Sequence, residues 1–87
     1  MPYYVYIIQC DDHTFYTGYS KNLDKRFRMH LKGKGARYLR IHKPNKIVHV
    51  EEFLSRSEAM RREKKIKLLT HRQKLRLSKS QLRARRK

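Results

Sequence analysis

Two tyrosine-rich segments that have the pattern of a β-hairpin constrain the fold of this chain more than any other feature. Residues 3–10 are β-branched or aromatic and contain no breaker, which is typical of a strand. Residues 11–14 have the composition of a turn, and residues 15–19 then predict the returning strand. Alternation puts one set of first-strand side chains on a single face of the sheet: Tyr4, Tyr6, Ile8 and Cys10. Gly18, near the end of the second strand, predicts a bulge, a bend or a close approach of backbone to a ligand.

A short helix follows the hairpin and carries two ionisable side chains in its apolar stripe. Ser20 or Asn22 can cap it, and helical spacing puts these residues on one face: Leu23, Arg26, Phe27, His30 and Leu31. Because burying an unpaired charge is costly, we expect Arg26 to line a cleft or to meet a partner. The structural alternative is that Arg26 reaches solvent from the edge of the stripe and that His30 is a hydrogen-bonded core histidine.

Residues 32–46 are expected to form a loop, because Gly33, Gly35 and Pro44 interrupt any regular pattern. The segment is rich in Lys and Arg, and its aromatic ring, Tyr38, offers a stacking face. Glycine also lets backbone N–H groups approach a phosphate. The spacing is not that of a Walker loop or a dinucleotide fold, so the signal for a mononucleotide site is weak. The segment suggests contacts with nucleic acid, and a solvated surface loop is the alternative.

The next part of the chain predicts a third strand and a long helix. Residues 46–53 are a plausible strand, although their hydrophobic alternation is poor. Ser55 and Glu58 have the spacing of a capping box and open a helix that runs to about Leu69. Glu63 shares a stripe of this helix with apolar residues. An acidic side chain therefore faces inward in a strongly basic helix.

The C-terminal part predicts a last helix and a basic tail. Thr70 and Gln73 repeat the capping pattern. From Ser78 onward the sequence is dominated by basic residues and is expected to fray. A chain of 87 residues has room for one thin core. We therefore predict a single domain over residues 1–78 and a basic C-terminal tail over residues 79–87.

Composition excludes several classes of function. The 24 Lys and Arg residues against 7 Asp and Glu give a formal net charge of +17, which favours a polyanionic partner, nucleic acid first. No apolar run is long enough to span a bilayer, and the N-terminal segment lacks the charged region of a secretory signal. Cys10 is the only cysteine, which excludes an internal disulfide and a multi-cysteine zinc site. We expect a cytoplasmic protein without a membrane partner, and the oligomeric state stays open.

The order of motifs over residues 3–69 resembles the GIY-YIG nuclease superfamily, in its small, stand-alone bacterial form. Residues 4–6, Tyr-Val-Tyr, stand at the position of the G-I-Y motif, and residues 16–18, Tyr-Thr-Gly, at that of Y-I-G. Residues 20–23, Ser-Lys-Asn-Leu, followed by Arg26, resemble the start of the family's first helix, and His30 falls where the family carries His or Tyr. The helix with Glu63 resembles the one that bears the family's metal-binding glutamate.

The chain departs from the family pattern at three positions. Tyr4 replaces the first glycine, Thr17 replaces isoleucine, and Tyr19 stands where several relatives have lysine. Only the last change puts a functional group in doubt, namely the contribution of that lysine. The resemblance implies an α/β fold of the α+β kind. We expect a small, mainly antiparallel three-stranded sheet with the 22–32 helix on one side and the 55–69 helix on another.

The resemblance also implies a site for phosphodiester hydrolysis, which needs an oriented water, stabilisation of phosphoryl charge and help for the leaving oxygen. Glu63 would hold a divalent ion, Mg²⁺ with Mn²⁺ as the alternative, and Arg26 would neutralise transition-state charge. Tyr6 would be the general base or would orient the water, with its phenol pKa lowered by neighbouring positive charge. Tyr16 would position phosphate or water, and His30 would assist proton transfer or orientation. The residue types leave open which of these three takes the proton.

Basic and aromatic side chains around this site are expected to contact nucleic acid: Lys21, Lys25, Lys32, Lys34, Arg37, Tyr38, Arg40 and Lys67. No recognition domain is present, so we expect binding to structure or backbone with little base specificity. The predicted function is a metal-dependent endonuclease acting on DNA, in repair or recombination. Two alternatives remain: an inactive nucleic-acid-binding module and a basic RNA-binding or ribosome-associated protein. Three inward ionisable residues favour the enzyme, because electrostatic binding alone needs no buried carboxylate: Arg26, His30 and Glu63.

Overall fold

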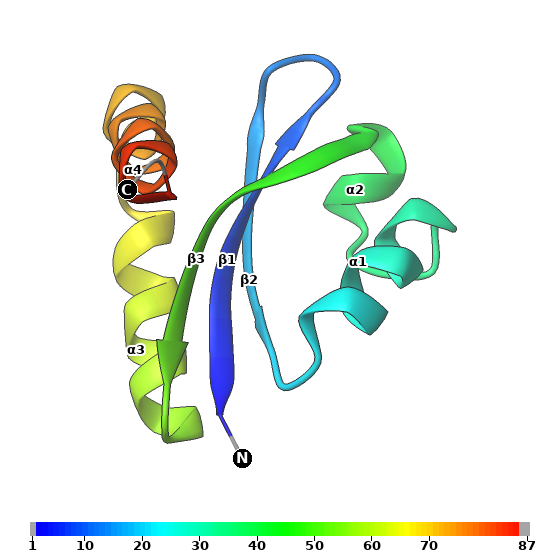
Figure 1. The fold of residues 1–87 in the computed structure, drawn as a ribbon. Coiled ribbons are helices and arrows are strands. Elements are labelled where there is room, and N and C mark those ends of the chain that lie inside the picture. Colours follow the sequence, from blue (N-terminus) through cyan, green and yellow to red (C-terminus); the bar gives the residue numbers. More distant parts are fainter. Residues whose placement is uncertain (1, 86–87) are drawn as a thin grey trace.

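A three-stranded antiparallel sheet forms the middle of the protein (Figure 1). The computed structural model describes the backbone of residues 2–85 and the side chains of residues 2–79. The strands are β1 (Tyr3–Cys10), β2 (Phe15–Ser20) and β3 (Pro44–Phe53), and β1 lies between the other two. β1 and β2 form the predicted hairpin, and β1 also pairs antiparallel with β3. The predicted α+β fold is confirmed, and every strand pair in the sheet is antiparallel.

Helices cover both faces of this sheet (Figure 1). α1 (Leu23–Leu31) and α2 (Tyr38–Ile41) lie on one face, and α3 (Arg56–Lys67) and α4 (His71–Arg85) lie on the other. The prediction that two main helices flank the sheet on different sides is therefore confirmed. Within the described part of the chain, no helix combines the length and the apolar character that crossing a membrane requires.

β1 is the centre of the core because its alternating side chains are buried on both faces. On one face Val5 and Ile7 pack against Ala59 and Ile66 of α3. On the other face Leu39 of α2 closes over a second group of β1 side chains: Tyr6, Ile8 and Cys10. The two faces predicted from the alternation are thus both observed, and the second one carries Tyr6 toward α1 and α2.

The capping residues predicted from the sequence set the starts of the helices. The side chain of Asn22, rather than that of Ser20, caps α1. Ser55 caps α3, and Thr70 and Gln73 cap α4 through reciprocal hydrogen bonds between side chain and backbone. These caps satisfy backbone N–H groups that have no partner inside the helix.

One local expectation was wrong. Residues 32–46 are not loop throughout, because Tyr38–Ile41 form one helical turn and β3 begins at Pro44. A single turn is too short to show helical periodicity, and it is held by the burial of Leu39. Leu31, assigned to the apolar stripe of the first helix, is the last residue of α1 and is exposed.

Fraying is predicted from Ser78 onward, and the α4 backbone in the structure is helical as far as Arg85. Its sequence favours this outcome, because good helix formers continue and neither Gly nor Pro interrupts them. The basic side chains at the end of the predicted tail lie outside the described side chains: Arg83, Arg85, Arg86 and Lys87. The boundary between residues 78 and 79 stays a prediction.

The poor alternation of β3 has a structural cause. Ile7 pairs with His49 whereas Ile8 pairs with Ile47, so the register shifts and Val48 is skipped in the pairing. Such a bulge inserts one extra residue and breaks the period of two. An irregular hydrophobic pattern is therefore what this strand requires.

Candidate active site

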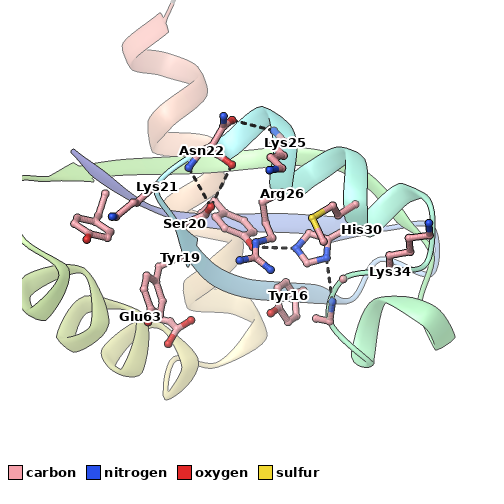
Figure 2. A pocket seen from close by; sticks show the side chains of 15 residues that line it. Tyr16, Tyr19, Ser20, Lys21, Asn22, Lys25, Arg26, His30, Lys34 and Glu63 are labelled. Carbon is pink, nitrogen blue, oxygen red and sulfur yellow. Dashed lines mark hydrogen bonds between the residues drawn. The ribbon is translucent and has the colours of Figure 1, made fainter. Parts of the chain in front are cut away.

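The five residues predicted to perform chemistry line one pocket, with a volume of about 690 Å³. It surrounds the free edge of β2 and receives side chains from β1, β2, α1 and α3 (Figure 2). The five residues are Tyr6, Tyr16, Arg26, His30 and Glu63. The fold thus brings together groups from both faces of the sheet.

Gly18 fixes the position of the Tyr6 phenol. The two residues pair across the β1–β2 hairpin, whose register runs without a shift. A Cβ atom at position 18 would lie 2.6 Å from the Tyr6 hydroxyl oxygen and 3.0 Å from the Tyr16 ring. Gly18 is therefore neither a bulge nor a bend in this pairing. The close approach that the glycine permits is to the Tyr6 ring, which a larger side chain would displace.

His30 is buried beside both tyrosines and is 2% exposed. Its Nε2 atom lies 2.9 Å from the Tyr6 hydroxyl oxygen, and its Nδ1 atom accepts a hydrogen bond of 3.2 Å from the backbone N–H of Ala36. Its ring centroid lies 6.1 Å from that of Tyr6 and 5.5 Å from that of Tyr16. The interpretation of His30 as a hydrogen-bonded core histidine is correct, and the same ring also lines the pocket.

Burial dominates the ionisation of these three rings. It raises the pKa of Tyr6 well above its ordinary value, Tyr16 and Glu63 raise it further, and the opposing effect of Arg26 is smaller. Burial also raises the pKa of Tyr16 and lowers that of His30, and Arg26 lowers the His30 pKa as well. The expectation that positive charge lowers the Tyr6 pKa is therefore wrong for the free protein, because burying a phenolate costs more than Arg26 returns.

Arg26 and Glu63 reach the pocket from different helices (Figure 2). Arg26, on α1, is exposed and lines the cleft, as its place in the apolar stripe predicted. The Glu63 side chain, on α3, is 16% exposed and forms an ion pair of 3.7 Å with Lys67. The pocket thus holds one carboxylate, which suits a metal ion, and several cationic side chains, which suit phosphate.

The residues present fit a hydrated divalent ion. Glu63 is the single carboxylate among the pocket-lining residues, and the described residues contain no group of three His, Cys, Asp or Glu that could cage a metal. Mg²⁺ is commonly held by one or two carboxylates while it keeps several waters. A structural zinc ion, by contrast, needs four protein ligands. The single carboxylate therefore suits a hydrated ion such as Mg²⁺ and does not suit an ion whose ligands all come from the protein.

The predicted nucleic-acid-binding residues fall into groups by location. Those that line the pocket are Lys21, Lys25 and Lys34. Those that line a second cavity of about 450 Å³ are Lys32 and Arg40. Those that are exposed outside both cavities are Arg37 and Lys67. Their contact with nucleic acid stays a prediction. The first group lies in the same pocket as the candidate catalytic residues.

Tyr38 is 38% exposed, and its ring has two aromatic neighbours. Its ring stacks on His42 at a centroid distance of 4.2 Å and on Tyr16 at 6.0 Å. Stacking of a nucleic-acid base on Tyr38 stays a prediction, and His42 would compete for the ring face that it covers. The contact places α2 against Tyr16, so Tyr38 also supports the wall of the pocket.

Seven further pocket residues were not among the predicted site residues: Tyr3, Tyr19, Ser20, Asn22, Met29, Gly35 and Ala36. The Tyr19 hydroxyl accepts a hydrogen bond of 3.4 Å from Nε of Arg56. Gly35 and Ala36 pack against His30 from the loop after α1. The Gly-Lys-Gly run was a signal for close backbone approach, but a sequence does not show onto which ring a loop folds back.

The family model described as the GIY-YIG catalytic domain matches residues 2–76. The chain is 47% identical over 75 residues to the UPF0213 protein SH2523 of Staphylococcus haemolyticus, a match that covers 86% of this chain and 92% of the relative. It is also 47% identical over 75 residues to the UPF0213 protein OB0043 of Oceanobacillus iheyensis, covering 86% and 87% of the two chains.

Two solution NMR structures have the same fold. The protein EF2693 from E. faecalis superposes with a TM-score of 0.63 at 35% identity, covering 92% of this chain and 85% of that one. The UPF0213 protein BH0048 from Bacillus halodurans superposes with a TM-score of 0.56 at 44% identity, covering 88% and 82%. The motifs, the pocket and these similarities agree, and the chain belongs to the GIY-YIG family of nuclease domains, in the group of small proteins designated UPF0213.

Proposed function

We propose that this protein is a metal-dependent endonuclease that hydrolyses phosphodiester bonds of DNA. The observation that carries the proposal is the meeting of five ionisable side chains in one pocket: Tyr6, Tyr16, Arg26, His30 and Glu63. Binding to nucleic acid by charge alone needs neither a half-buried carboxylate nor a buried tyrosine–histidine hydrogen bond. Burying polar and ionisable groups lowers stability, so their presence together in a cleft indicates a functional site.

In the proposed reaction the Tyr6 phenolate removes a proton from the attacking water. The water oxygen bonds to phosphorus, the bond from phosphorus to the leaving sugar oxygen breaks, and that oxygen takes a proton from solvent. Arg26 stabilises the charge that develops on the phosphoryl oxygens. Tyr16 positions the phosphate, and His30 orients the Tyr6 phenol through their hydrogen bond.

Glu63 is the residue that would hold the divalent ion, Mg²⁺ or Mn²⁺, with water and phosphate oxygens as the remaining ligands. Such an ion supplies charge stabilisation at the phosphoryl and leaving oxygens when it is bound. The location of Glu63 supports the assignment, because its carboxylate is partly buried in the pocket and its partner Lys67 lies on the exposed side of α3.

The substrate is expected to be recognised through its backbone and shape. The lysines at the pocket and the net charge of +17 favour contact with phosphates. The proposal places the activity in DNA repair or recombination, in the cytoplasm. Cys10, the single cysteine, is buried and has no disulfide partner in this chain, which is consistent with that compartment.

A nicking assay tests the proposal. The protein is incubated with plasmid, branched DNA, single-stranded DNA and RNA, each with Mg²⁺, with Mn²⁺ and with chelator. We expect cleavage of DNA that requires the ion, a loss of orders of magnitude in Glu63→Gln and a loss of about 10²–10⁴-fold in Arg26→Ala. Glu58→Gln, at an exposed position on the same helix, is the matched control. Binding to DNA without cleavage would favour an inactive module, and binding to RNA alone would favour an RNA-binding protein.

A further inference from the structure

The contacts of His30 assign it a fixed role. We infer that the Gly35–Ala36 turn locks the His30 imidazole as a permanent hydrogen-bond donor to Tyr6, so that His30 stabilises the Tyr6 phenolate and does not accept its proton. This inference rests on the proposed function and gives it a direction of proton flow. It also makes Gly35 and Ala36 positioning residues of the site.

Each ring nitrogen of His30 has one polar neighbour. The Ala36 backbone N–H can only donate, so His30 Nδ1, 3.2 Å away, must be an unprotonated acceptor. A neutral imidazole carries one proton, which is then on Nε2. Nε2 lies 2.9 Å from the Tyr6 hydroxyl oxygen. His30 is therefore the donor in this bond, and the Tyr6 oxygen is the acceptor.

Neither alternative protonation state fits these contacts. A proton on Nδ1, in the other tautomer or in the imidazolium ion, would face the N–H of Ala36 and leave two donors opposed. The imidazolium would also be buried, with the Arg26 guanidinium near it, and both effects lower the pKa of His30. His30 can accept the Tyr6 proton only if the turn moves away.

Gly35 is what allows the turn to come so close. A Cβ atom at position 35 would lie 1.9 Å from His30 Nδ1 and 2.6 Å from Cε1. The ring cannot move aside easily, because it is buried and bonded at both nitrogens. Gly33 serves another purpose: its φ of 74° is left-handed, and a Cβ atom there would meet nothing within 4 Å. Gly33 allows the chain to turn, and Gly35 leaves space for the His30 imidazole.

The consequence concerns the path of the proton. A hydrogen bond donated to a phenol oxygen favours the phenolate over the phenol. It thereby offsets part of the burial that raises the Tyr6 pKa. The proton that Tyr6 takes from the attacking water leaves the phenol oxygen through pocket water. His30 keeps its Nε2 proton from the start of the reaction to the end.

The first test reads the tautomer directly in the protein without nucleic acid. Long-range ¹H–¹⁵N correlation spectra at neutral pH should show His30 protonated at Nε2 and unprotonated at Nδ1. Gly35→Ala should shift both His30 nitrogens or mix the tautomers. Gly33→Asn is the control two residues away: asparagine tolerates the left-handed φ and its Cβ atom meets open space, so the His30 nitrogens should be unchanged. A proton on Nδ1, or an imidazolium, in the parent protein would overturn the inference.

The second test separates a donor from a base. The side-chain amide of His30→Gln can donate a hydrogen bond from the place of Nε2 but cannot accept a proton, and His30→Phe can do neither. We expect His30→Gln to cleave within about tenfold of the parent, and His30→Phe to fall by roughly 10–100-fold, the loss of one hydrogen bond to a charged group. Equal loss in both variants, with both folded, would make His30 a proton acceptor and overturn the inference.

The failure of the proposed function would look different. A parent protein that cleaves no substrate refutes the nuclease, and the spectra still decide which nitrogen of His30 carries the proton. A Tyr6→Phe background adds a check on coupling. There His30→Gln and His30→Phe should have the same residual rate, because the acceptor oxygen is gone.

Discussion

The Tyr6 hydroxyl is buried in the wall of the pocket, and that location controls how cleavage should depend on pH. Only the phenolate can take a proton from water, and the Tyr6 pKa lies above its ordinary value of 10.0. Between about pH 6 and pH 9 the phenolate fraction therefore grows tenfold for each pH unit. We predict that kcat/KM, whose pH dependence reports groups of the free protein, rises with that slope and shows no plateau in this range.

Tyr6→Phe is the control for this pH profile. Its cleavage rate should be lower than that of the parent and should no longer show the pH dependence caused by ionisation of the Tyr6 phenol. A parent profile that levels off near neutral pH would assign the base to a different group, such as a water molecule held at Glu63.

Thr17 supports a prediction about stability. Its hydroxyl is buried and, within the described residues, has no hydrogen-bond partner. Valine has the same shape without the polar atom, so Thr17→Val removes a desolvation cost. We expect a gain of about 1 kcal/mol in the free energy of unfolding, or about 4–8 °C in Tm, measured by calorimetry.

Thr14→Val is the comparison for that measurement. The Thr14 hydroxyl donates a hydrogen bond of 2.7 Å to Asp12, so its removal should bring no gain. If both variants gained equally, β propensity rather than the unsatisfied hydroxyl would explain the effect.

At the level of single residues, the sequence predicted which side chains share the site but not what state they are in. The helical stripe placed Arg26 and His30 on one face, and the motif spacing brought Tyr6 beside Tyr16. The direction of the Tyr6 pKa shift was missed, because it depends on how deeply the fold buries the phenol. The contact of Gly35 with His30 was missed as well, because it depends on the path of a loop.

On the scale of elements, α3 is held to the sheet by a polar contact next to the site. Arg62 donates hydrogen bonds of 2.7 and 3.0 Å to Glu51 of β3, and His49 lies 2.7 Å from the same carboxylate. Arg62 precedes Glu63 in the chain, so this contact lies one residue from the candidate metal ligand. Loss of this contact should therefore affect both the packing of α3 on the sheet and the position of the Glu63 carboxylate.

We predict that Glu51→Gln lowers the free energy of unfolding by about 1–3 kcal/mol, because Arg62 keeps its charge without an anionic partner. Glu52→Gln, at the exposed neighbouring position, should have little effect. Urea unfolding of both variants measures the difference. Calorimetric titration with Mg²⁺ should also show weaker binding in Glu51→Gln, and equal stability of the two variants would contradict the assigned contact.

The elements that the sequence predicted are those with a strong local signal. The Ser55 and Thr70 caps gave helix starts that the structure confirms. The turn Tyr38–Ile41 has no such signal, since its burial through Leu39 is a tertiary effect. The bulge of β3 was visible only as poor alternation, because a register shift needs the partner strand to define it.

For the whole molecule, the charge of +17 predicts a steep dependence of DNA binding on salt. Residues 83–87 contribute four basic side chains: Arg83, Arg85, Arg86 and Lys87. Each phosphate contact adds about 0.9 to the slope of log K against log salt. Deleting residues 83–87 should therefore weaken binding to all sequences alike and flatten the slope by roughly 1–3 units.

Fluorescence anisotropy over a salt series measures that slope, and cleavage at low salt and saturating DNA provides the control. The chemical step should survive, because the pocket lies on β1, β2, α1 and α3. A deletion that abolished turnover at saturation, or that changed the preferred substrate without changing the slope, would show that the C-terminal residues act at the site.

The central place of β1 also has a consequence for how the chain folds. Of the three strands, β1 is synthesised first and β3 last, and the two strands are paired in the folded protein. Tyr3 pairs with Phe53 and Cys10 pairs with Pro44, so this pairing cannot form until β3 has been synthesised. Until then one edge of β1 in the hairpin is unpaired. Bringing β3 to that edge closes a long loop, and the entropy lost in closing it precedes the stabilising contacts between the strands. Tyr6 is thus in place only after β3 arrives. We expect an early intermediate that has the β1–β2 hairpin but no assembled pocket, and a chain released at that stage would be open to aggregation through the β1 edge.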